Sequence, residues 1–440
     1  MRDGGMPTGP RIYNLFPLLA GSTTQWIALL PKIAEMGFDW VYLNPFHLPG
    51  FSGSLYAVKD YTRLHPVIQG ESTKPADELL SAFVRAARGH GLKVMMDLVI
   101  NHTSKDSLLA DEHPEFFLRD KKGKLVSPSA IDPADANKVT VWGDLAEIDY
   151  RPSPARKVLV ETWKTMIAHY LELGFGGFRC DAAYQVPGDV WSELIAHGRK
   201  RGEVAFMAET LGCRLEQTEQ LAGAGFDAFF NSSKWWNFRE PWLLEQYESF
   251  REVAPSIAFP ESHDTPRLVT ELREKGVRDT WRIEATYRLR YLFAVFFSTG
   301  VMMPMGFETG QRRKLDVVKM KPADLEEPLF DLASFVAAAN RMKRDIPALN
   351  EEGPQQRITS PDSPVVGLLR TTNEGSSRCL ALINPSEDAT YAVPTDGIMR
   401  AAGSGWQVVC DTNLGAVEGA FEPGATMRFR PLSMRILRQG

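Results

Sequence analysis

The sequence predicts an α/β protein built on a (β/α)8 (TIM) barrel, and three observations support this fold class. Short apolar segments alternate with longer amphipathic ones from residue 12 to residue 343, as in parallel strands joined by crossover helices. Eight of the apolar segments read as strands and no glycine-rich phosphate loop is present, which favours a closed barrel over an open sheet. Beyond Pro347 the pattern changes to short alternating strands separated by turn residues, which predicts an antiparallel β-sandwich.

The predicted barrel strands share short apolar runs bounded by Gly, Pro or Asn. They cover residues 12–16, 40–43, 92–100, 176–181, 204–209, 226–230, 256–260 and 300–303. The predicted helices carry apolar residues at helical spacing. One of them, at residues 75–90, has Pro75 in its first turn and Gly91 just after its end, as helix boundaries favour. The others cover residues 24–36, 155–173, 189–199, 280–297 and 329–343.

Residues 102–153 interrupt the alternation after the third strand. This stretch is polar, rich in Pro, Asp and Lys, and too long for an ordinary loop, so we expect a functional excursion or a small domain. The predicted organisation is therefore a catalytic barrel of residues 1–101 and 154–346, an inserted domain at residues 102–153 and a C-terminal β-sandwich at residues 347–440.

The composition excludes several classes of protein. The 440 residues are 44% hydrophobic, enough for a large core, and the net charge of −5 contains no long runs, which argues against nucleic acid as a partner. Residues 1–10 have no apolar signal core, and the most apolar window, residues 291–306, is too interrupted to span a membrane. The scattered cysteines lack metal-ligand spacing: Cys180, Cys213, Cys379 and Cys410. We expect a cytoplasmic protein without a membrane partner, and the oligomeric state stays open.

Residues 177–183 read as a short buried strand that follows a glycine-rich break. Side chains alternate along a strand, so Arg179 and Asp181 point one way while Phe178 and Cys180 point the other. A guanidinium beside Asp181 favours the ionised carboxylate, as a nucleophile requires. Taken alone, a structural ion pair at the strand end explains the same two residues equally well.

Polar residues collect at the ends of several predicted strands, where (β/α)8 barrels place their chemistry. The third strand leads through Asp97 to Asn101 and His102, the fifth ends at Glu209, and Ser262-His263-Asp264 follows the seventh. Each has a structural alternative: a buried acid for Asp97, a capped loop residue for His102 and a helix cap for Glu209. Their shared position at successive strand ends favours one active site.

This set of carboxylates is typical of a retaining glycosidase, in which two carboxyl groups lie about 5 Å apart across the bond that is cleaved. Asp181, beside Arg179, is predicted to be the ionised nucleophile. Glu209 lies among apolar residues that should raise its pKa, so it is the predicted general acid and base. Asp264 is expected to bind ring hydroxyls, with His102 and His263 adding hydrogen bonds.

The same segments resemble the α-amylase superfamily, glycoside hydrolase family 13, in order across most of the predicted barrel. Residues 97–102, 177–183, 206–210 and 259–264 are similar to its four motifs, and residues 142–147 to a further motif of its domain B. Residues 56–61 are similar to the segment whose aromatic residue stacks under the sugar. The resemblance implies Asp181, Glu209 and Asp264 as catalytic residues and Tyr56, Asp60, His102, Arg179 and His263 as substrate-binding residues.

The chain also departs from the family pattern. Ser262 stands where the family commonly has Asn, and Tyr184-Gln185 stands where many α-amylases have Lys-His. No cofactor is required by the chemistry. Asn101 matches a usual calcium ligand and is a possible one here, but its partner ligands are not recognisable in the short excursion, so calcium stays an open alternative.

Other segments look like the maltosyltransferases of this family that extend α-1,4-glucan from maltose 1-phosphate. They are residues 33–39, 113–117, 191–195 and 221–226. Those enzymes are longer than this chain. For a donor phosphate, Lys59 and Arg267 are candidate contacts, although the sequence does not place either one. Trp235 and Trp236 are candidates for sugar stacking or for helix packing.

We therefore predict a retaining enzyme that hydrolyses α-glucosidic bonds of an oligosaccharide or related α-glucoside through a covalent glycosyl-enzyme. Transfer to a sugar acceptor is the first alternative, because hydrolysis and transfer differ only in which hydroxyl resolves the intermediate. A catalytically inactive carbohydrate-binding relative is the second alternative, but such proteins usually lose a catalytic carboxylate and all three are present here.

Overall fold

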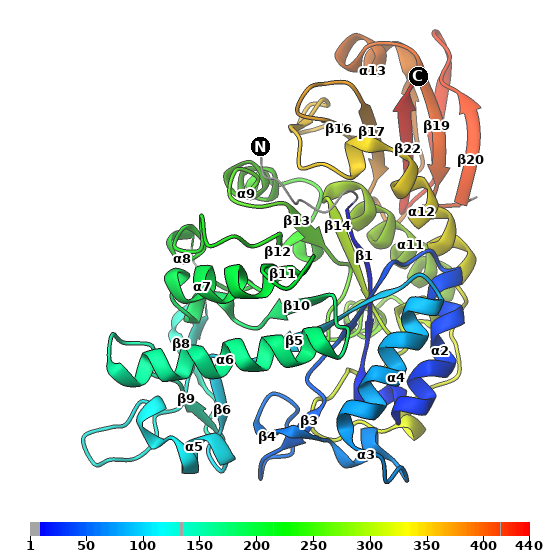
Figure 1. Ribbon diagram of the computed structural model, residues 1–440. Coiled ribbons are helices and arrows are strands. Elements are labelled where there is room, and N and C mark those ends of the chain that lie inside the picture. The colour runs from blue at the N-terminus through cyan, green and yellow to red at the C-terminus, as the bar shows by residue number, and fades with distance from the viewer. Residues whose placement is uncertain (1–8, 133–134, 214, 414) are drawn as a thin grey trace.

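The computed structural model describes residues 9–132, 135–213, 215–413 and 415–440. Within these residues, eight parallel strands close into a barrel in the order β1-β14-β13-β12-β11-β10-β5-β2 (Figure 1). Every predicted barrel strand overlaps an observed one, so the predicted fold class is confirmed. The strands are β1 (Arg11–Leu15), β2 (Trp40–Leu43), β5 (Lys93–Leu98), β10 (Gly177–Cys180), β11 (Ala205–Ala208), β12 (Ala228–Phe230), β13 (Ser256–Ala258) and β14 (Gly300–Pro304).

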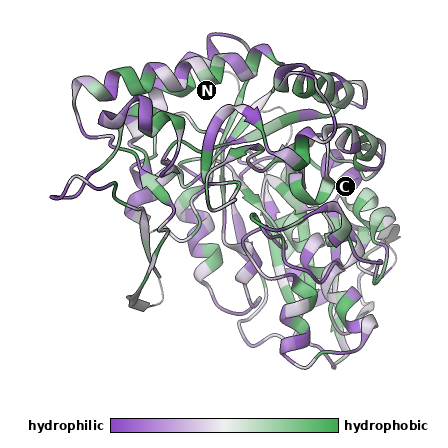
Figure 2. Cartoon of the chain, turned by 90° about the horizontal axis from the view of Figure 1, so that it is seen from below, coloured by the Kyte–Doolittle hydropathy of each residue, from purple (hydrophilic) through white to green (hydrophobic). Residues whose placement is uncertain are grey.

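Most helices around the barrel are amphipathic, and in Figure 2 helices carry both hydrophobic (green) and hydrophilic (purple) residues, whereas α11 is buried over most of its length. The longer ones are α2 (Thr23–Glu35), α4 (Ala76–Gly89), α6 (Pro154–Glu172), α7 (Gly188–Arg199), α9 (Trp242–Phe250), α11 (Thr280–Phe297) and α12 (Ala333–Asp345). Short helices are α1 (Pro17–Ala20), α3 (Pro66–Gln69), α8 (Leu215–Glu219) and α10 (Leu268–Glu274), of which the sequence analysis predicted none; it also missed α9. No helix in the described part of the chain has the length and apolarity needed to cross a bilayer.

The barrel strands have a hydrophobic cluster on each side, one inside the barrel and one between the strands and the surrounding helices. Met95, Met207 and Met302 belong to the cluster inside the barrel, whereas Phe178 and Cys180 belong to the outer layer between strands and helices. The predicted alternation along β10 is thereby confirmed. Gly177 begins β10, and a Cβ there would lie 2.8 Å from the carbonyl oxygen of Ala205, so only glycine lets β10 and β11 approach this closely.

Two excursions leave the barrel at the carboxyl ends of its strands. The first, which the sequence analysis did not predict, is a hairpin after β2 made of β3 (His47–Pro49) and β4 (Val58–Leu64). The second lies between β5 and α6, at the lower left of Figure 1. It contains β6 (His102–Ser104) paired with β9 (Leu145–Glu147), α5 (Leu108–Glu112), and the pair β7 (Ser129–Asp132) and β8 (Asp135–Val141).

The C-terminal strands form a separate antiparallel layer at the top right of Figure 1. In the described residues one sheet has the order β15-β16-β17-β22-β19-β20, and a smaller one pairs β18 with β21. Helix α13 (Thr395–Ala402) packs with both in one hydrophobic cluster. The strands are β15 (Gln355–Arg357), β16 (Val366–Thr371), β17 (Arg378–Asn384), β18 (Tyr391–Pro394), β19 (Trp406–Asp411), β20 (Gly415–Ala420), β21 (Thr426–Phe429) and β22 (Ser433–Gln439). The predicted domain limits stay a prediction, and residues 1–8, on which the expectation of a missing signal segment rests, lie outside the described residues.

Candidate active site

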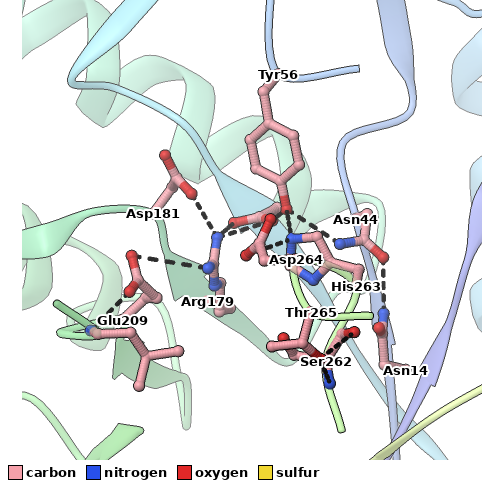
Figure 3. Close-up of polar contacts among 12 residues, drawn as sticks. Asn14, Asn44, Tyr56, Arg179, Asp181, Glu209, Ser262, His263, Asp264 and Thr265 are labelled. Atoms are coloured by element: carbon pink, nitrogen blue, oxygen red, sulfur yellow. Dashed lines mark hydrogen bonds and ion pairs between the residues drawn. The ribbon is translucent and has the colours of Figure 1, made fainter. Parts of the chain in front are cut away.

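A cluster of polar side chains lies at the carboxyl ends of the barrel strands, around the guanidinium of Arg179 (Figure 3). Arg179 Nη1 donates to Asp97 at 2.8 and 3.0 Å and to Asp181 Oδ1 at 2.6 Å. Its Nη2 lies 3.8 Å from Glu209 Oε2. One cation thus contacts an acid of β5 and the acids that directly follow β10 and β11. The predicted pairing of Arg179 with Asp181 is present in the structure.

Burial raises the pKa of Asp181 above its ordinary value, and the Arg179 guanidinium acts against this shift by stabilising the carboxylate. The side chain of Asp181 is almost completely buried, so it has little contact with solvent. The sequence analysis considered only the effect of Arg179. The structure adds the opposing effect of burial.

Glu209 is held in place by two backbone amides. Ala182 N donates to Glu209 Oε2 at 2.9 Å and Leu211 N donates to Oε1 at 2.7 Å. Ala182, which donates one of these bonds, has a left-handed conformation with φ of 39°, an uncommon one for a residue with a side chain. Burial raises the pKa of Glu209 to about 7, with Arg179 opposing and Asp181 reinforcing the shift. Glu209 can therefore hold a proton near neutral pH, as the apolar sequence around it predicts.

Tyr56, from the hairpin after β2, joins the acid cluster to the residues that follow β13. Its hydroxyl donates to Asp97 Oδ2 at 2.7 Å and lies 2.8 Å from His263 Nε2. A tyrosine hydroxyl has one proton, so His263 donates through Nε2 to Tyr56. The same Nε2 lies 3.2 Å from Asp264 Oδ2, and the Asp264 side chain is 67% exposed. The structure therefore brings together Tyr56, His263 and Asp264, with Asp264 open to a ligand.

Several buried polar atoms in this region lack a partner within the described residues. They are His102 Nε2, His263 Nδ1, Ser262 Oγ and Asn101 Oδ1. Burial lowers the pKa of His102 to about 4, so its ring is neutral at pH 7 and suits hydrogen bonds with uncharged hydroxyl groups. Unpartnered buried donors and acceptors are costly, which indicates that a ligand completes them.

Three residues of the site were missed from the sequence as functional candidates. Tyr42 donates to Asp97 Oδ2 at 2.6 Å, Asn44 Nδ2 donates to Tyr56 Oη at 3.0 Å, and Asn14 Nδ2 donates to Asn44 Oδ1 at 2.8 Å. They lie at the carboxyl ends of β1 and β2. The rule that located the other residues, polar side chains at strand ends, would have found all three.

Comparison with known proteins agrees with this geometry. Residues 11–123 match the family model of the glycogen debranching enzyme glucanotransferase domain. An alpha-1,4-glucan:maltose-1-phosphate maltosyltransferase of Burkholderia pseudomallei is 30% identical over 366 residues, which is 82% of this chain and 31% of that protein. The alpha-amylase MalA of Haloarcula japonica is 25% identical over 409 residues, 85% of this chain and 54% of that protein. The chain is a member of the α-amylase family.

The same fold is present in a solved structure of this family, the noncanonic maltogenic alpha-amylase AmyB from Thermotoga neapolitana. That structure superimposes with a TM-score of 0.74 at 21% identity and covers 98% of both chains. By contrast, this chain spans about a third of the Burkholderia relative and about half of the Haloarcula one. The family membership predicted from the motifs is confirmed, including the resemblance to the maltosyltransferases.

The remaining predicted residues divide into those near the cluster and those away from it. The hydrogen bonds described for Asp60 go to Thr62 N and Oγ1, at 2.8 and 2.7 Å, and not to the Arg179 cluster. Trp236 is fully buried against Phe293, whereas Trp235 is 50% exposed beside Phe259. Of the two tryptophans, only Trp235 is therefore available to stack on a sugar.

The residues around Asn101 do not fit a calcium site. Asn101 Nδ2 lies 3.3 Å from Gln185 Oε1, so two neutral amides face each other. Among the described residues, no group of three His, Cys, Asp or Glu side chains could hold a metal ion. Calcium prefers several oxygen ligands that include carboxylates. Calcium therefore has no part in the chemistry proposed below.

Proposed function

We propose that this α-amylase family chain is a retaining enzyme that hydrolyses α-glucosidic bonds of oligosaccharides. The observation that carries the proposal is that two of the three carboxyl groups around the Arg179 guanidinium, those of Asp181 and Glu209, lie in different environments. Asp181 accepts a 2.6 Å hydrogen bond from Arg179, whereas Glu209, 3.8 Å from that cation, has a pKa of about 7. Double displacement requires an ionised carboxylate beside a protonated one. The hydrogen bond from Arg179 favours the ionised form of Asp181 against the effect of burial, and the raised pKa of Glu209 favours its protonated form.

In the proposed mechanism, an Asp181 oxygen attacks the anomeric carbon while Glu209 gives its proton to the leaving glycosidic oxygen. This step forms the glycosyl-enzyme bond and breaks the bond between sugars. Glu209, now ionised, then takes a proton from water, whose oxygen attacks the anomeric carbon and releases Asp181. Asp264 accepts hydrogen bonds from ring hydroxyls, and the neutral His102 accepts or donates such bonds, as the sugar ring flattens toward the transition state.

Incubation with maltoheptaose, with products followed by mass spectrometry and anomers by NMR, tests this proposal. We expect shorter α-maltooligosaccharides whose new reducing end appears first as the α anomer. The Asp181→Asn variant is the control and should release none of them. Initial release of the β anomer, or unchanged activity in the variant, would exclude a retaining mechanism through Asp181.

Transfer of the glycosyl group to a sugar hydroxyl is the second candidate function, and the similar proteins favour it. The first three relatives are named alpha-1,4-glucan:maltose-1-phosphate maltosyltransferases, at 24 to 30% identity. The mechanism is the same up to the glycosyl-enzyme, and a sugar hydroxyl then replaces water. Chains longer than maltoheptaose, or phosphate released from maltose 1-phosphate, would establish transfer. Sugar binding without any turnover would instead favour a carbohydrate-binding protein.

We also propose that the protein works in the cytoplasm. All four of its cysteines are free thiols, and three of them, Cys180, Cys379 and Cys410, are buried. Unpaired cysteines are usual where thiols stay reduced and less so in secreted proteins. Cell fractionation followed by immunodetection tests the location, and recovery from the medium would contradict it.

A further inference from the structure

Next to the Arg179 cluster, a chain of buried hydrogen bonds runs from β1 through β2 to Asp97. It begins at a backbone carbonyl: Asn14 Nδ2 donates to the carbonyl oxygen of Tyr42 at 3.3 Å and to Asn44 Oδ1 at 2.8 Å (Figure 3). A carbonyl oxygen can only accept, so this contact fixes which end of the Asn14 amide faces Asn44. Asn44 must then present its oxygen to Asn14, and its Nδ2 points the other way.

The orientation of the Asn44 amide decides where two tyrosine protons go. Asn44 Nδ2 lies 3.2 Å from Tyr42 Oη and 3.0 Å from Tyr56 Oη and donates to both. Each hydroxyl oxygen therefore accepts from Asn44 and keeps its own single proton to donate. The acceptor is Asp97 Oδ2, which lies 2.6 Å from Tyr42 Oη and 2.7 Å from Tyr56 Oη. Burial raises the pKa of both tyrosines well above its ordinary value, so both protons stay on the hydroxyl groups.

The ionised form of Asp97 depends on these donors, because its side chain is 0% exposed and has no contact with water. Among the described residues, its other partner is Arg179 Nη1, at 2.8 Å from Oδ1 and 3.0 Å from Oδ2. Burial raises the pKa of Asp97 and Asp181 adds to this effect, whereas Arg179 and the hydrogen bond from Tyr42 lower it. A proton on Oδ2 would have to displace one of three donors that point to this oxygen, so the hydrogen bonds favour the carboxylate.

The charge of Asp97 affects Glu209, because both acids face the same cation. Arg179 Nη1 contacts Asp97 and Asp181, and its Nη2 lies 3.8 Å from Glu209 Oε2. When Asp97 and Asp181 are both ionised, two carboxylates outweigh the single positive charge of Arg179. Little of that charge is then left to stabilise an ionised Glu209, and Glu209 holds its proton more tightly.

The other groups around the two acids supply no second cation. The titratable and charged side chains that interact with Asp97 are Tyr42, Tyr56, His102, Arg179, Cys180 and Asp181. Those that interact with Glu209 are Arg179, Asp181, Tyr184, Cys213 and Asp264. Burial lowers the pKa of His102 to about 4, so of these side chains Arg179 alone is a cation at pH 7. Its charge is therefore the one that Asp97 and Glu209 compete for.

We propose that Tyr42 is a positioning residue that keeps Asp97 ionised, and that the ionised Asp97 in turn lets Glu209 keep the proton it gives to the leaving oxygen. The proposal rests on the proposed function, in which Glu209 is the general acid. Tyr42 is 1% exposed, so it acts through Asp97 and not on the substrate. The alternative is that Tyr42 only fills the inside of the barrel, where it packs in the inner hydrophobic cluster. The two interpretations differ in whether loss of the hydroxyl changes the ionisation of the acids.

NMR titration of the carboxyl carbons in the full chain tests the first step without requiring turnover. The Tyr42→Phe variant keeps the ring and removes the hydroxyl. We expect the pKa of Asp97 to rise by about one to two pH units, since a charged group loses one hydrogen bond. Tyr13→Phe is the matched control, because Tyr13 is also buried on a barrel strand but donates to a different acid, Glu308, at 3.0 Å. It should leave the pKa of Asp97 unchanged.

The second step is tested with Asp97→Asn, which also assigns the Asp97 signal by its loss. Removal of this anion leaves the charge of Arg179 to Asp181 and Glu209. The pKa of Glu209, whose signal is assigned with Glu209→Gln, should therefore fall from about 7. We expect a fall of about one pH unit or more. The decline of kcat/KM on maltoheptaose at high pH should move to lower pH by the same amount, whereas Tyr13→Phe should keep the wild-type profile.

Each outcome supports or overturns the proposal. An unchanged Asp97 in Tyr42→Phe, an equal rise in Tyr13→Phe, or an unchanged Glu209 in Asp97→Asn overturns it. If Tyr42→Phe does not fold, the wild type decides: a protonated Asp97 between about pH 6 and pH 8 overturns the proposal without any variant. Turnover of maltoheptaose without these pKa changes removes this inference alone. The pKa changes without turnover leave the role of Tyr42 and remove the proposed function.

Discussion

The barrel mouth and the junction between the barrel and the C-terminal sheet both bury charged groups, but they satisfy them differently. At the junction, Lys343 Nζ lies 3.1, 2.8 and 2.6 Å from three backbone carbonyl oxygens, and Arg370 donates to the carbonyl oxygens of Phe296 and Glu351. Glu352 accepts from Ser256 and Thr299. At the mouth, one Arg179 faces three buried acids, and several polar atoms have no partner among the described residues.

This difference separates charges that stabilise the fold from charges that serve a ligand. At the junction, the charged groups of Lys343, Arg370 and Glu352 bond to backbone carbonyl oxygens and hydroxyl groups, although Arg370 Nε has no partner among the described residues. These residues therefore stabilise the contact between the barrel and the sheet. The mouth holds more carboxyl groups than cations and leaves histidine and hydroxyl groups without partners among the described residues. Burial, reinforced by the neighbouring acids, raises the pKa of Asp181 and Glu209. Substitutions at the mouth should therefore change activity more than stability, and substitutions at the junction should do the opposite.

The largest expected effect is the loss of the proposed nucleophile. Asp181→Asn should lower kcat/KM on maltoheptaose by about 10³-fold or more, because the amide cannot form the glycosyl-enzyme. The melting temperature should stay the same or rise, since one acid leaves a buried cluster that has an excess of them. Enzyme assays and thermal unfolding on the same preparation measure both. A large fall in melting temperature would place Asp181 with the junction residues and contradict the comparison.

The second effect is a pH dependence caused by Glu209. Its pKa is about 7 in the folded chain against an ordinary 4.5, so the folded state binds its proton more tightly. The stability from this proton is present below pH 4.5 and is lost as the pH rises through 7, by about 3 kcal/mol. Relative to Glu209→Gln, the wild type should therefore lose stability between pH 5 and pH 8, and its kcat/KM should decline above about pH 7.

Unfolding of the wild type and of Glu209→Gln, each at pH 5 and at pH 8, measures the difference in the free energy of unfolding. The exposed Glu172→Gln substitution on α6 is the control and should follow the wild type at both pH values. If the difference between the wild type and Glu209→Gln does not change with pH, Glu209 is ionised throughout and cannot be the general acid.

Most of the barrel was predictable because apolar strands and amphipathic helices alternate along the sequence. The local alternation around Arg179 and Asp181 also predicted their shared direction, since side chains on one strand alternate strictly. The hairpin after β2 was missed, because β3 has only three residues and its pairing with the largely polar β4 is irregular, with shifts in register. As a result the contacts of Tyr56 with Asp97 and His263 could not be derived from the sequence alone.

Residue roles that depend on contacts between distant segments also could not be predicted from the sequence. Arg267 looked available for phosphate, but its partners come from Glu261, Arg313 and Met305, and only folding brings these together. The opposing effects of burial and Arg179 on the pKa of Asp181 likewise depend on the depth of the site. The residue types at the strand ends were enough to locate the candidate site. The hydrogen bonds and ion pairs that link its residues could be identified only in the structure.

A third prediction tests the junction. Lys343→Met removes the only side chain described as donating to the carbonyl oxygens of Val295, Ser298 and Leu349, so it should destabilise the folded chain by about 2 to 3 kcal/mol. The kcat/KM of the protein that remains folded should stay within about twofold of the wild type, since the junction is not part of the mouth. Thermal unfolding and initial rates measure the two effects. Arg341→Met, an exposed charge loss on the same helix α12, is the control and should leave both values unchanged.

The smallest expected effect is that of Tyr56→Phe, which keeps the ring but removes the hydroxyl between Asp97 and His263. The variant should lower kcat/KM by about tenfold, because His263 loses the acceptor that orients its Nε2 beside Asp264. The stacked contact between the two rings, 5.6 Å between centroids, should remain and keep the melting temperature near that of the wild type. Tyr61→Phe is the matched control, since that hydroxyl donates to the carbonyl oxygen of Val99 rather than to the catalytic cluster. An equal loss of activity in both variants would show that the Tyr56 hydroxyl has no special role in placing His263.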